Sequence, residues 1–188
     1  AAAGIRDSVA SRGLGDVSKR QGIPLISAIR AAREALDDCG KSGEVSLVAA
    51  GGIRSGTDVA KCLALGADAV MIGTAGLVAL GCNSPRYLED YTALGTAPGR
   101  CHHCHTGLCP VGVATQDPEL EKRVDIPAAS ERVARFLTAM TMEVSLLAKA
   151  CGKSNVHNLE VEDLRAMSLE ASAFTGVKLA GIDRPYSW

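Results

Sequence analysis

Residues 45–56 have the sequence VSLVAAGGIRSG, and this stretch decides the fold of the chain. It opens with a short apolar run and continues into a pair of glycines. A run of this length with glycines behind it favours a buried parallel strand over a helix. We therefore predict a strand over residues 45–50 and a tight loop at its carboxyl end.

Helical and strand patterns alternate on both sides of this stretch. Apolar residues recur at helical spacing over residues 25–39 and again over residues 56–65. A second buried strand is predicted over residues 68–73, followed by a helix over residues 77–80. Alternating strands and helices at this spacing are typical of a parallel sheet or barrel, so the fold class is α/β.

The rest of the chain is predicted to contain one helix cap, one long loop and two further helices. Thr57 or Asp58 is a suitable cap for the helix after the first strand. Residues 83–117 resemble a long loop, which in a compact domain is usually functional. A long amphipathic helix is predicted to end at residue 150, and a last helix is predicted over residues 160–173. The first twenty residues show no period and are predicted to be irregular.

Composition excludes several classes of partner. The chain of 188 residues has 20 Lys and Arg against 21 Asp and Glu, which gives no electrostatic reason to expect nucleic acid. Aromatic residues make up only 3%, too few for base-stacking surfaces. No apolar run approaches the roughly 20 residues that span a bilayer, and no signal-peptide pattern is present. We expect a cytoplasmic protein that binds neither nucleic acid nor membrane.

Two glycine-rich loops follow the two predicted strands. Glycine lets backbone N–H groups approach a phosphate, and each loop leads into a helix whose N-terminus favours an anion. Gly51, Gly52 and Arg54 belong to the first loop, and Gly73 and Thr74 to the second. The alternative is that these glycines only turn strand into helix. Two such loops on consecutive strands, one with an arginine, favour a phosphate site.

Cysteines are the unusual feature of the composition. Three of the seven, Cys101, Cys104 and Cys109, lie in the stretch CHHCHTGLCP. Thiolates at this spacing followed by proline indicate an iron–sulfur cluster. A structural zinc is the rival, with one histidine from His102, His103 or His105 as fourth ligand, and free thiols are the third alternative.

The remaining cysteines are scattered. Cys82 follows the second predicted strand and its helix, and its thiol could reach the cluster across the intervening loop. Cys39, Cys62 and Cys151 lie on helical faces and are predicted to be small core residues.

With these residues in view, the chain resembles the FMN-binding domain of the glutamate synthase large subunit family, which includes archaeal-type glutamate synthases and the N-methylglutamate synthase subunit. The similar segments are residues 21–24, 45–61, 63–70, 79–82 and 104–118, and the tail over residues 157–181 is similar as well. The glycine–arginine loop by itself occurs in other families. Joined to the sequence CPVGVATQ, it is specific.

The resemblance implies the last two strands of a (β/α)8 TIM barrel, with an iron–sulfur loop and C-terminal helices. It implies three segments: residues 1–82 with the FMN phosphate loops, 83–118 with the cysteines, and 119–188 as helices. The implied FMN-binding residues are Ala50, Gly51, Gly52, Arg54, Gly73 and Thr74. The implied cluster ligands come from Cys82, Cys101, Cys104 and Cys109. Three of them would hold a [3Fe-4S] cluster, and all four a [4Fe-4S] cluster.

The implied activity is that of an oxidoreductase, with electrons passing from the cluster to FMN for reduction of 2-iminoglutarate to glutamate, or of an N-methylglutamate analogue. 2-Oxoglutarate or glutamate is the expected substrate, with amidotransferase-type and electron-donating subunits as partners. Two strands do not close a barrel, so the remainder is expected on another chain or in a longer polypeptide. No catalytic residue is assigned. The alternatives are a zinc-stabilised structural subunit and a barrel of the inosine monophosphate dehydrogenase type.

Overall fold

The computed structural model describes residues 23–182. The first twenty residues, predicted to be irregular, lie outside the described part. The chain forms two compact units. One consists of residues up to 72 together with those from 140 onward, and the other of residues 73–139.

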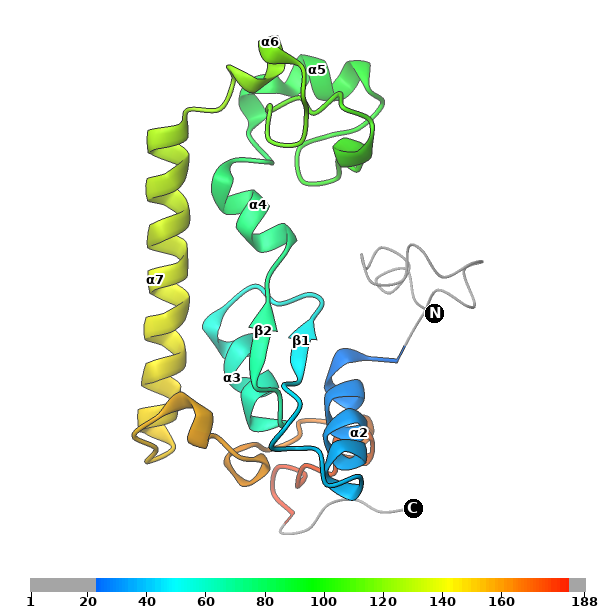
Figure 1. Ribbon diagram of the computed structural model, residues 1–188, viewed down its shortest axis with the longest axis vertical. Coiled ribbons are helices and arrows are strands. Elements are labelled where there is room, and N and C mark those ends of the chain that lie inside the picture. Colours follow the sequence, from blue (N-terminus) through cyan, green and yellow to red (C-terminus); the bar gives the residue numbers. More distant parts are fainter. Residues whose placement is uncertain (1–22, 183–188) are drawn as a thin grey trace. The chain divides into compact units, whose positions relative to one another are not determined.

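The first unit contains a βαβ arrangement. Helix α2 spans Leu25–Asp38, strand β1 Val48–Ala50, helix α3 Gly56–Ala64 and strand β2 Ala69–Met71. The two strands lie side by side and parallel, with α3 connecting them (Figure 1). The predicted order of strand, helix and strand is therefore confirmed, as is the parallel direction of the strands.

Both strands are shorter than the sequence predicts. The Asp68 carboxylate accepts a hydrogen bond of 2.6 Å from the Leu47 N–H and pairs with Arg33 at 2.7 Å. Because this side chain takes the Leu47 N–H, the ladder begins only at Val48. The Leu47 N–H also lowers the pKa of Asp68, and Arg33 lowers it further.

One face of the two-stranded sheet is open. Ala49 is buried at 3% exposure, whereas Val48 and Met71 are 48% and 62% exposed. The prediction of buried strands is thus correct for Ala49 and wrong for Val48 and Met71. Within residues 23–182 no third strand pairs with β1 or β2, so both outer edges lack a partner there.

Helix α3 begins one residue or more before the predicted caps. Ser55 is the N-cap, and its Oγ accepts a hydrogen bond of 3.4 Å from the Asp58 N–H. The inner face of α3 packs against the last part of α7, a helix that spans Ile126–Ala150 and belongs to both units. The buried core between them consists of Ala60, Leu63, Ala64, Val144, Ala148 and Leu159.

The segment after α7 differs from the predicted single helix over residues 160–173. It forms 3-10 turns η4 (Val156–Asn158) and η5 (Val161–Asp163) before helix α8 (Leu169–Thr175). Ala166 forms an isolated parallel bridge with Leu179. This pairing needs extended backbone, which interrupts the helical pattern between η5 and α8.

The second unit is mostly helical. Its elements are α4 (Thr74–Leu80), η2 (Pro85–Tyr87), α5 (Leu88–Ala93), η3 (His103–His105), α6 (Pro118–Glu121) and the first part of α7. The prediction of a loop through residues 83–117 is wrong where η2, α5 and η3 form. A helix of six residues is too short to be stable by itself, so tertiary contacts decide its conformation.

None of the helices within residues 23–182 combines the length and apolar character that crossing a membrane requires.

Candidate functional site

The first glycine loop follows β1 directly. Ala50, the last residue of β1, is paired with Met71, the last residue of β2. Gly51 and Gly52 have φ angles of 134° and 68°, and a Cβ at either would meet no atom within 4 Å. These glycines are therefore required by backbone conformation and face open space, as an approach by a phosphate would need.

Arg54 lies on the exposed side of the same loop. Its Nε donates a hydrogen bond of 3.3 Å to the Gly52 carbonyl, and its backbone N–H donates one of 3.0 Å to Asp58. No carboxylate pairs with its guanidinium in the described part of the chain. The charge of this side chain is thus free to meet an anion.

The N-terminus of α3 is already occupied by a carboxylate of the same chain. Glu143 in α7 accepts hydrogen bonds from the Gly56 N–H at 2.7 Å and from the Thr57 hydroxyl at 2.5 Å. The Thr57 hydroxyl, and then the backbone N–H groups of Gly56 and Thr57, lower the pKa of Glu143. A phosphate at the first loop would therefore contact the glycine backbone and Arg54, and not the first turn of α3. Sequence reasoning missed Glu143, because it lies far from α3 along the chain.

Gly73 and Thr74, the other predicted phosphate ligands, belong to the second unit. Gly73 precedes α4 and Thr74 is its first residue. No side chain caps α4, so its first N–H groups have no side-chain acceptor among residues 23–182. A phosphate site shared by the two loops stays a prediction.

Four cysteines gather in the second unit. Cys82 follows the αL residue that ends α4, and burial raises the pKa of its thiol. The thiols of Cys104, Cys109 and Cys101 raise it further by repulsion between their negative forms. The other three candidate ligands therefore each lie within electrostatic range of the Cys82 thiol.

The surroundings of these thiols are suited to a soft metal group. A cavity of about 380 Å³ opens beside Cys104 and is also lined by Gly107 and residues 113–116. The Nδ1 atom of His103 is buried and has no hydrogen-bond partner within the described residues. No group of three His, Cys, Asp or Glu side chains in residues 23–182 is arranged as a ready-made metal site. Thiols beside a histidine nitrogen are nonetheless the donor types that iron–sulfur and zinc groups use.

A small buried core fixes the loop that carries the cysteines. Tyr91 is 0% exposed and packs with Cys109 and Val111, while Cys101 lies against this core. The Tyr91 phenol donates a hydrogen bond to the Cys82 carbonyl. Sequence reasoning did not find Tyr91, because a lone tyrosine in an apparent loop carries no motif.

Arg123 links α5, which carries Tyr91, to the residue that follows Cys109. Arg123 pairs with Asp90 at 2.9 Å and donates a hydrogen bond of 2.7 Å to the Pro110 carbonyl. Arg123 also lies over the ring of Tyr87, 4.9 Å from its centroid. Asp90 is the residue before Tyr91, so one arginine connects α5 with the segment that follows the last clustered cysteine.

Of the three cysteines predicted to be core residues, only one is buried. Cys62 is 3% exposed and is one of the buried residues of α3, which confirms that prediction. Cys39 and Cys151 are exposed, so the prediction is wrong for them. Each follows directly after the last residue of a helix, Asp38 of α2 or Ala150 of α7, and so lies beyond the packed helical face.

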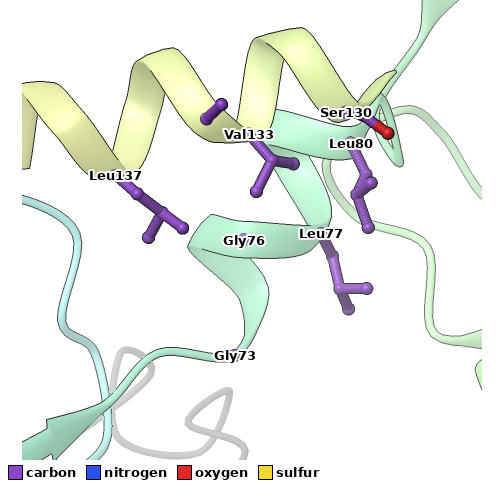
Figure 2. A pocket seen from close by; sticks show the side chains of 8 residues that line it. Gly73, Gly76, Leu77, Leu80, Ser130, Val133 and Leu137 are labelled. Atoms are coloured by element: carbon purple, nitrogen blue, oxygen red, sulfur yellow. The ribbon is translucent and has the colours of Figure 1, made fainter. Parts of the chain in front are cut away.

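An apolar groove lies between α4 and the first part of α7. Figure 2 shows Gly76, Leu77 and Leu80 on α4 and Val133 and Leu137 on the neighbouring α7. The groove has a volume of about 590 Å³, and its lining contains no titratable side chain. It provides packing surface rather than groups for chemistry.

A parallel βαβ unit with a glycine–arginine loop, joined to a segment that gathers four thiols, defines an α/β protein with a thiol-rich loop. The chain belongs to the glutamate synthase family: residues 13–154 match the family described as "Conserved region in glutamate synthase".

Relatives with established names support this assignment. The chain is 54% identical over 160 residues to "Glutamate synthase large subunit-like protein" of Rhizobium meliloti, which covers 85% of this chain and 36% of the relative. It is 41% identical over 164 residues to "Archaeal glutamate synthase [NADPH]" of Methanocaldococcus jannaschii, covering 85% of this chain and 29% of the relative. The chain thus spans about a third of the length of these relatives. No solved structure matches it significantly.

Proposed function

We propose that this chain is the part of a glutamate synthase-type oxidoreductase that carries an FMN phosphate loop and an iron–sulfur loop. The observation that carries the proposal is the gathering of Cys82, Cys101, Cys104 and Cys109 in one unit. Membership of the glutamate synthase family favours this proposal over the inosine monophosphate dehydrogenase alternative, which predicts neither a cluster nor a flavin.

The first loop would hold the flavin phosphate. Gly51 and Gly52 offer backbone N–H groups with open space at their Cβ positions, and Arg54 offers a guanidinium that pairs with no carboxylate among residues 23–182. Ala50 would place this loop at the end of β1, and Gly73 and Thr74 would add the second loop. Because Glu143 fills the start of α3, the arginine carries more of the phosphate recognition than the helix N-terminus does.

The second unit would hold an iron–sulfur cluster through three or four of its thiols, [3Fe-4S] or [4Fe-4S] respectively. When bound, the cluster and FMN supply the electron and hydride transfer that reduces 2-iminoglutarate to glutamate, or an N-methylglutamate analogue. The chain's own residues keep the ligands in place: Tyr91 fixes the Cys82 backbone, and Arg123 fixes the Pro110 carbonyl.

The rest of the active unit would come from outside this chain. The open edges of β1 and β2 and the exposed Val48 and Met71 are surfaces that further barrel strands and helices would cover. The chain spans only 36% and 29% of its relatives, which is consistent with the missing strands lying on another chain or in a longer polypeptide. Amidotransferase-type and electron-donating subunits, with 2-oxoglutarate or glutamate as substrate, belong to the same proposal.

A zinc site is the second candidate, and the buried Nδ1 atom of His103 favours it. This nitrogen lies unpartnered, within the described residues, in the loop that carries the thiols. A Cys3His site would satisfy it. In that case the chain would be a structural subunit without redox chemistry.

Metal analysis of the anaerobically purified chain, with anything that co-purifies, separates the two candidates. Iron with acid-labile sulfide, a broad visible shoulder and extractable FMN would support the proposal in full. Iron and sulfide without flavin would support the cluster and place FMN binding with the rest of the barrel. Zinc without sulfide, in a colourless protein, would overturn the redox proposal.

A further inference from the structure

Tyr91 is an unusual residue for the segment in which it lies. It belongs to α5, a helix of six residues within a stretch that the sequence predicts to be a loop. Its side chain is 0% exposed, and it is the largest of the fully buried side chains in the described part. Helix α5 is too short to be stable by itself, and yet the large side chain of its Tyr91 is completely buried.

The contacts of Tyr91 reach candidate ligands from both ends of the cysteine segment. Its phenol donates to the carbonyl of Cys82, at the beginning of the segment. Its ring shares a dry core with Cys109, at the end of the segment, and Cys101 packs against that core. One side chain therefore connects the main chain of Cys82 with Cys109, 27 residues further along the sequence.

The phenol is a permanent donor in this position. A tyrosine phenol ordinarily has a pKa of about 10. At neutral pH the phenol is protonated, so the hydrogen bond to the Cys82 carbonyl persists. Asp90, the preceding residue, is held by Arg123 at 2.9 Å, which fixes the backbone that carries the ring.

We propose that Tyr91 is a positioning residue for the iron–sulfur cluster: its phenol fixes the main chain of Cys82 while its ring holds Cys109. The inference rests on the proposed cluster function. It adds that the loop is organised for its ligands before the metal arrives. Groups that orient metal ligands in this way typically change metal affinity about 10–100-fold when they are removed.

Tyr91→Phe is the variant that tests this, because it removes the phenol oxygen and keeps the ring. Tyr87→Phe is the matched control. Tyr87 is half-buried against the same core, and its phenol donates to a carbonyl at 3.3 Å, but the acceptor is Arg123 and not a cysteine. Both variants are purified anaerobically beside the wild type, and far-UV circular dichroism checks that they fold.

The readouts are the iron content, the rate of iron loss to a chelator, and the electron paramagnetic resonance spectrum of the cluster. We expect Tyr91→Phe to lose iron about tenfold faster and to show shifted g-values, and Tyr87→Phe to match the wild type. Equal behaviour of the two variants would overturn the inference. A wild-type chain without iron and sulfide would instead refute the cluster proposal, and with it this role.

Hydrogen exchange of the wild type gives a second test that needs no variant. If Tyr91 organises the loop in advance, amides in residues 88–94 will be equally protected in the apo and cluster-loaded chains. Protection that develops only on loading the cluster would show that the metal organises the loop, which contradicts the proposal.

Discussion

The carboxylate of Glu143 accepts a 2.7 Å hydrogen bond from the N–H of Gly56, the first residue of α3. The two residues belong to different helices of the first unit and approach closely because residue 56 has no side chain. A Cβ at Gly56 would lie 2.5 Å from the Met140 carbonyl oxygen and 2.6 Å from the Glu143 Cβ. The glycine that follows the first glycine loop is thus also the contact point of α7.

This contact predicts a pH dependence. The pKa of Glu143 is lowered in the folded chain, chiefly by the Thr57 hydroxyl, so its contribution to stability is present at neutral pH. The contribution is lost as the pH falls below the ordinary glutamate pKa of about 4.3 and through the lowered folded value. Glu143→Gln should reduce the free energy of unfolding at pH 7 and flatten its decline in acid.

Urea unfolding at several pH values measures this effect. Glu131→Gln is the control, since Glu131 lies on the same helix in an exposed ion pair with Arg135. The interpretation fails if the two variants show the same acid dependence.

Gly112 in the VGVATQ segment is expected to tolerate no side chain. Its φ is 80°, and a Cβ would overlap the Leu120 carbonyl oxygen. Gly112→Ala should therefore lose about 3 kcal/mol of unfolding free energy through strain and overlap. Gly95→Ala has a similar φ of 67° and meets no atom within 4 Å, so it should lose only about 1–2 kcal/mol. Similar losses in thermal unfolding would contradict the role of the Leu120 contact.

The cysteines should divide into two groups. Cys104→Ala and Cys109→Ala should both abolish iron binding, because either thiol is required in every ligand set considered. Cys62→Ala should retain full iron, since Cys62 is a buried residue of α3 in the first unit and the candidate ligands belong to the second. Full iron content in Cys104→Ala would refute the motif assignment.

The choice of ligand set follows from one further comparison. Iron loss in Cys82→Ala alone selects Cys82, Cys104 and Cys109, and loss in Cys101→Ala alone selects Cys101 in place of Cys82. Loss in both variants indicates that all four thiols bind. Iron and sulfide analysis per chain decides among these outcomes.

Arg54→Ala should weaken FMN binding about tenfold while leaving the unfolding midpoint unchanged, since the exposed side chain hydrogen-bonds only the Gly52 carbonyl within the described part of the chain. Flavin fluorescence titration of the complex measures this. Riboflavin, which lacks the phosphate, should bind equally to both proteins. An equal loss for FMN and riboflavin would place Arg54 away from the phosphate.

The sequence by itself determined the order of the βαβ unit and several of the helix ends. Gly66 and Gly152 follow α3 and α7 at φ angles of 110° and 75°, conformations that glycine adopts without strain. The spacing of Cys101, Cys104 and Cys109 indicated a metal group, and their gathering with Cys82 agrees with this. Local pattern is sufficient for these features because each depends on residues close together in the chain.

The bounds of β1, the cap of α3 and the conformation of α5 depend on tertiary contacts. The start of β1 depends on the Asp68 carboxylate, and the Glu143 carboxylate accepts from the first turn of α3. Helix α5 is held by the hydrogen bond of Tyr91 to Cys82 and the ion pair of Asp90 with Arg123. Each of these is a contact between residues distant in sequence, and none leaves a periodic signal. The physical reason is that a short strand or helix gains its stability from its partners, so its boundaries are set by those partners and not by its own sequence.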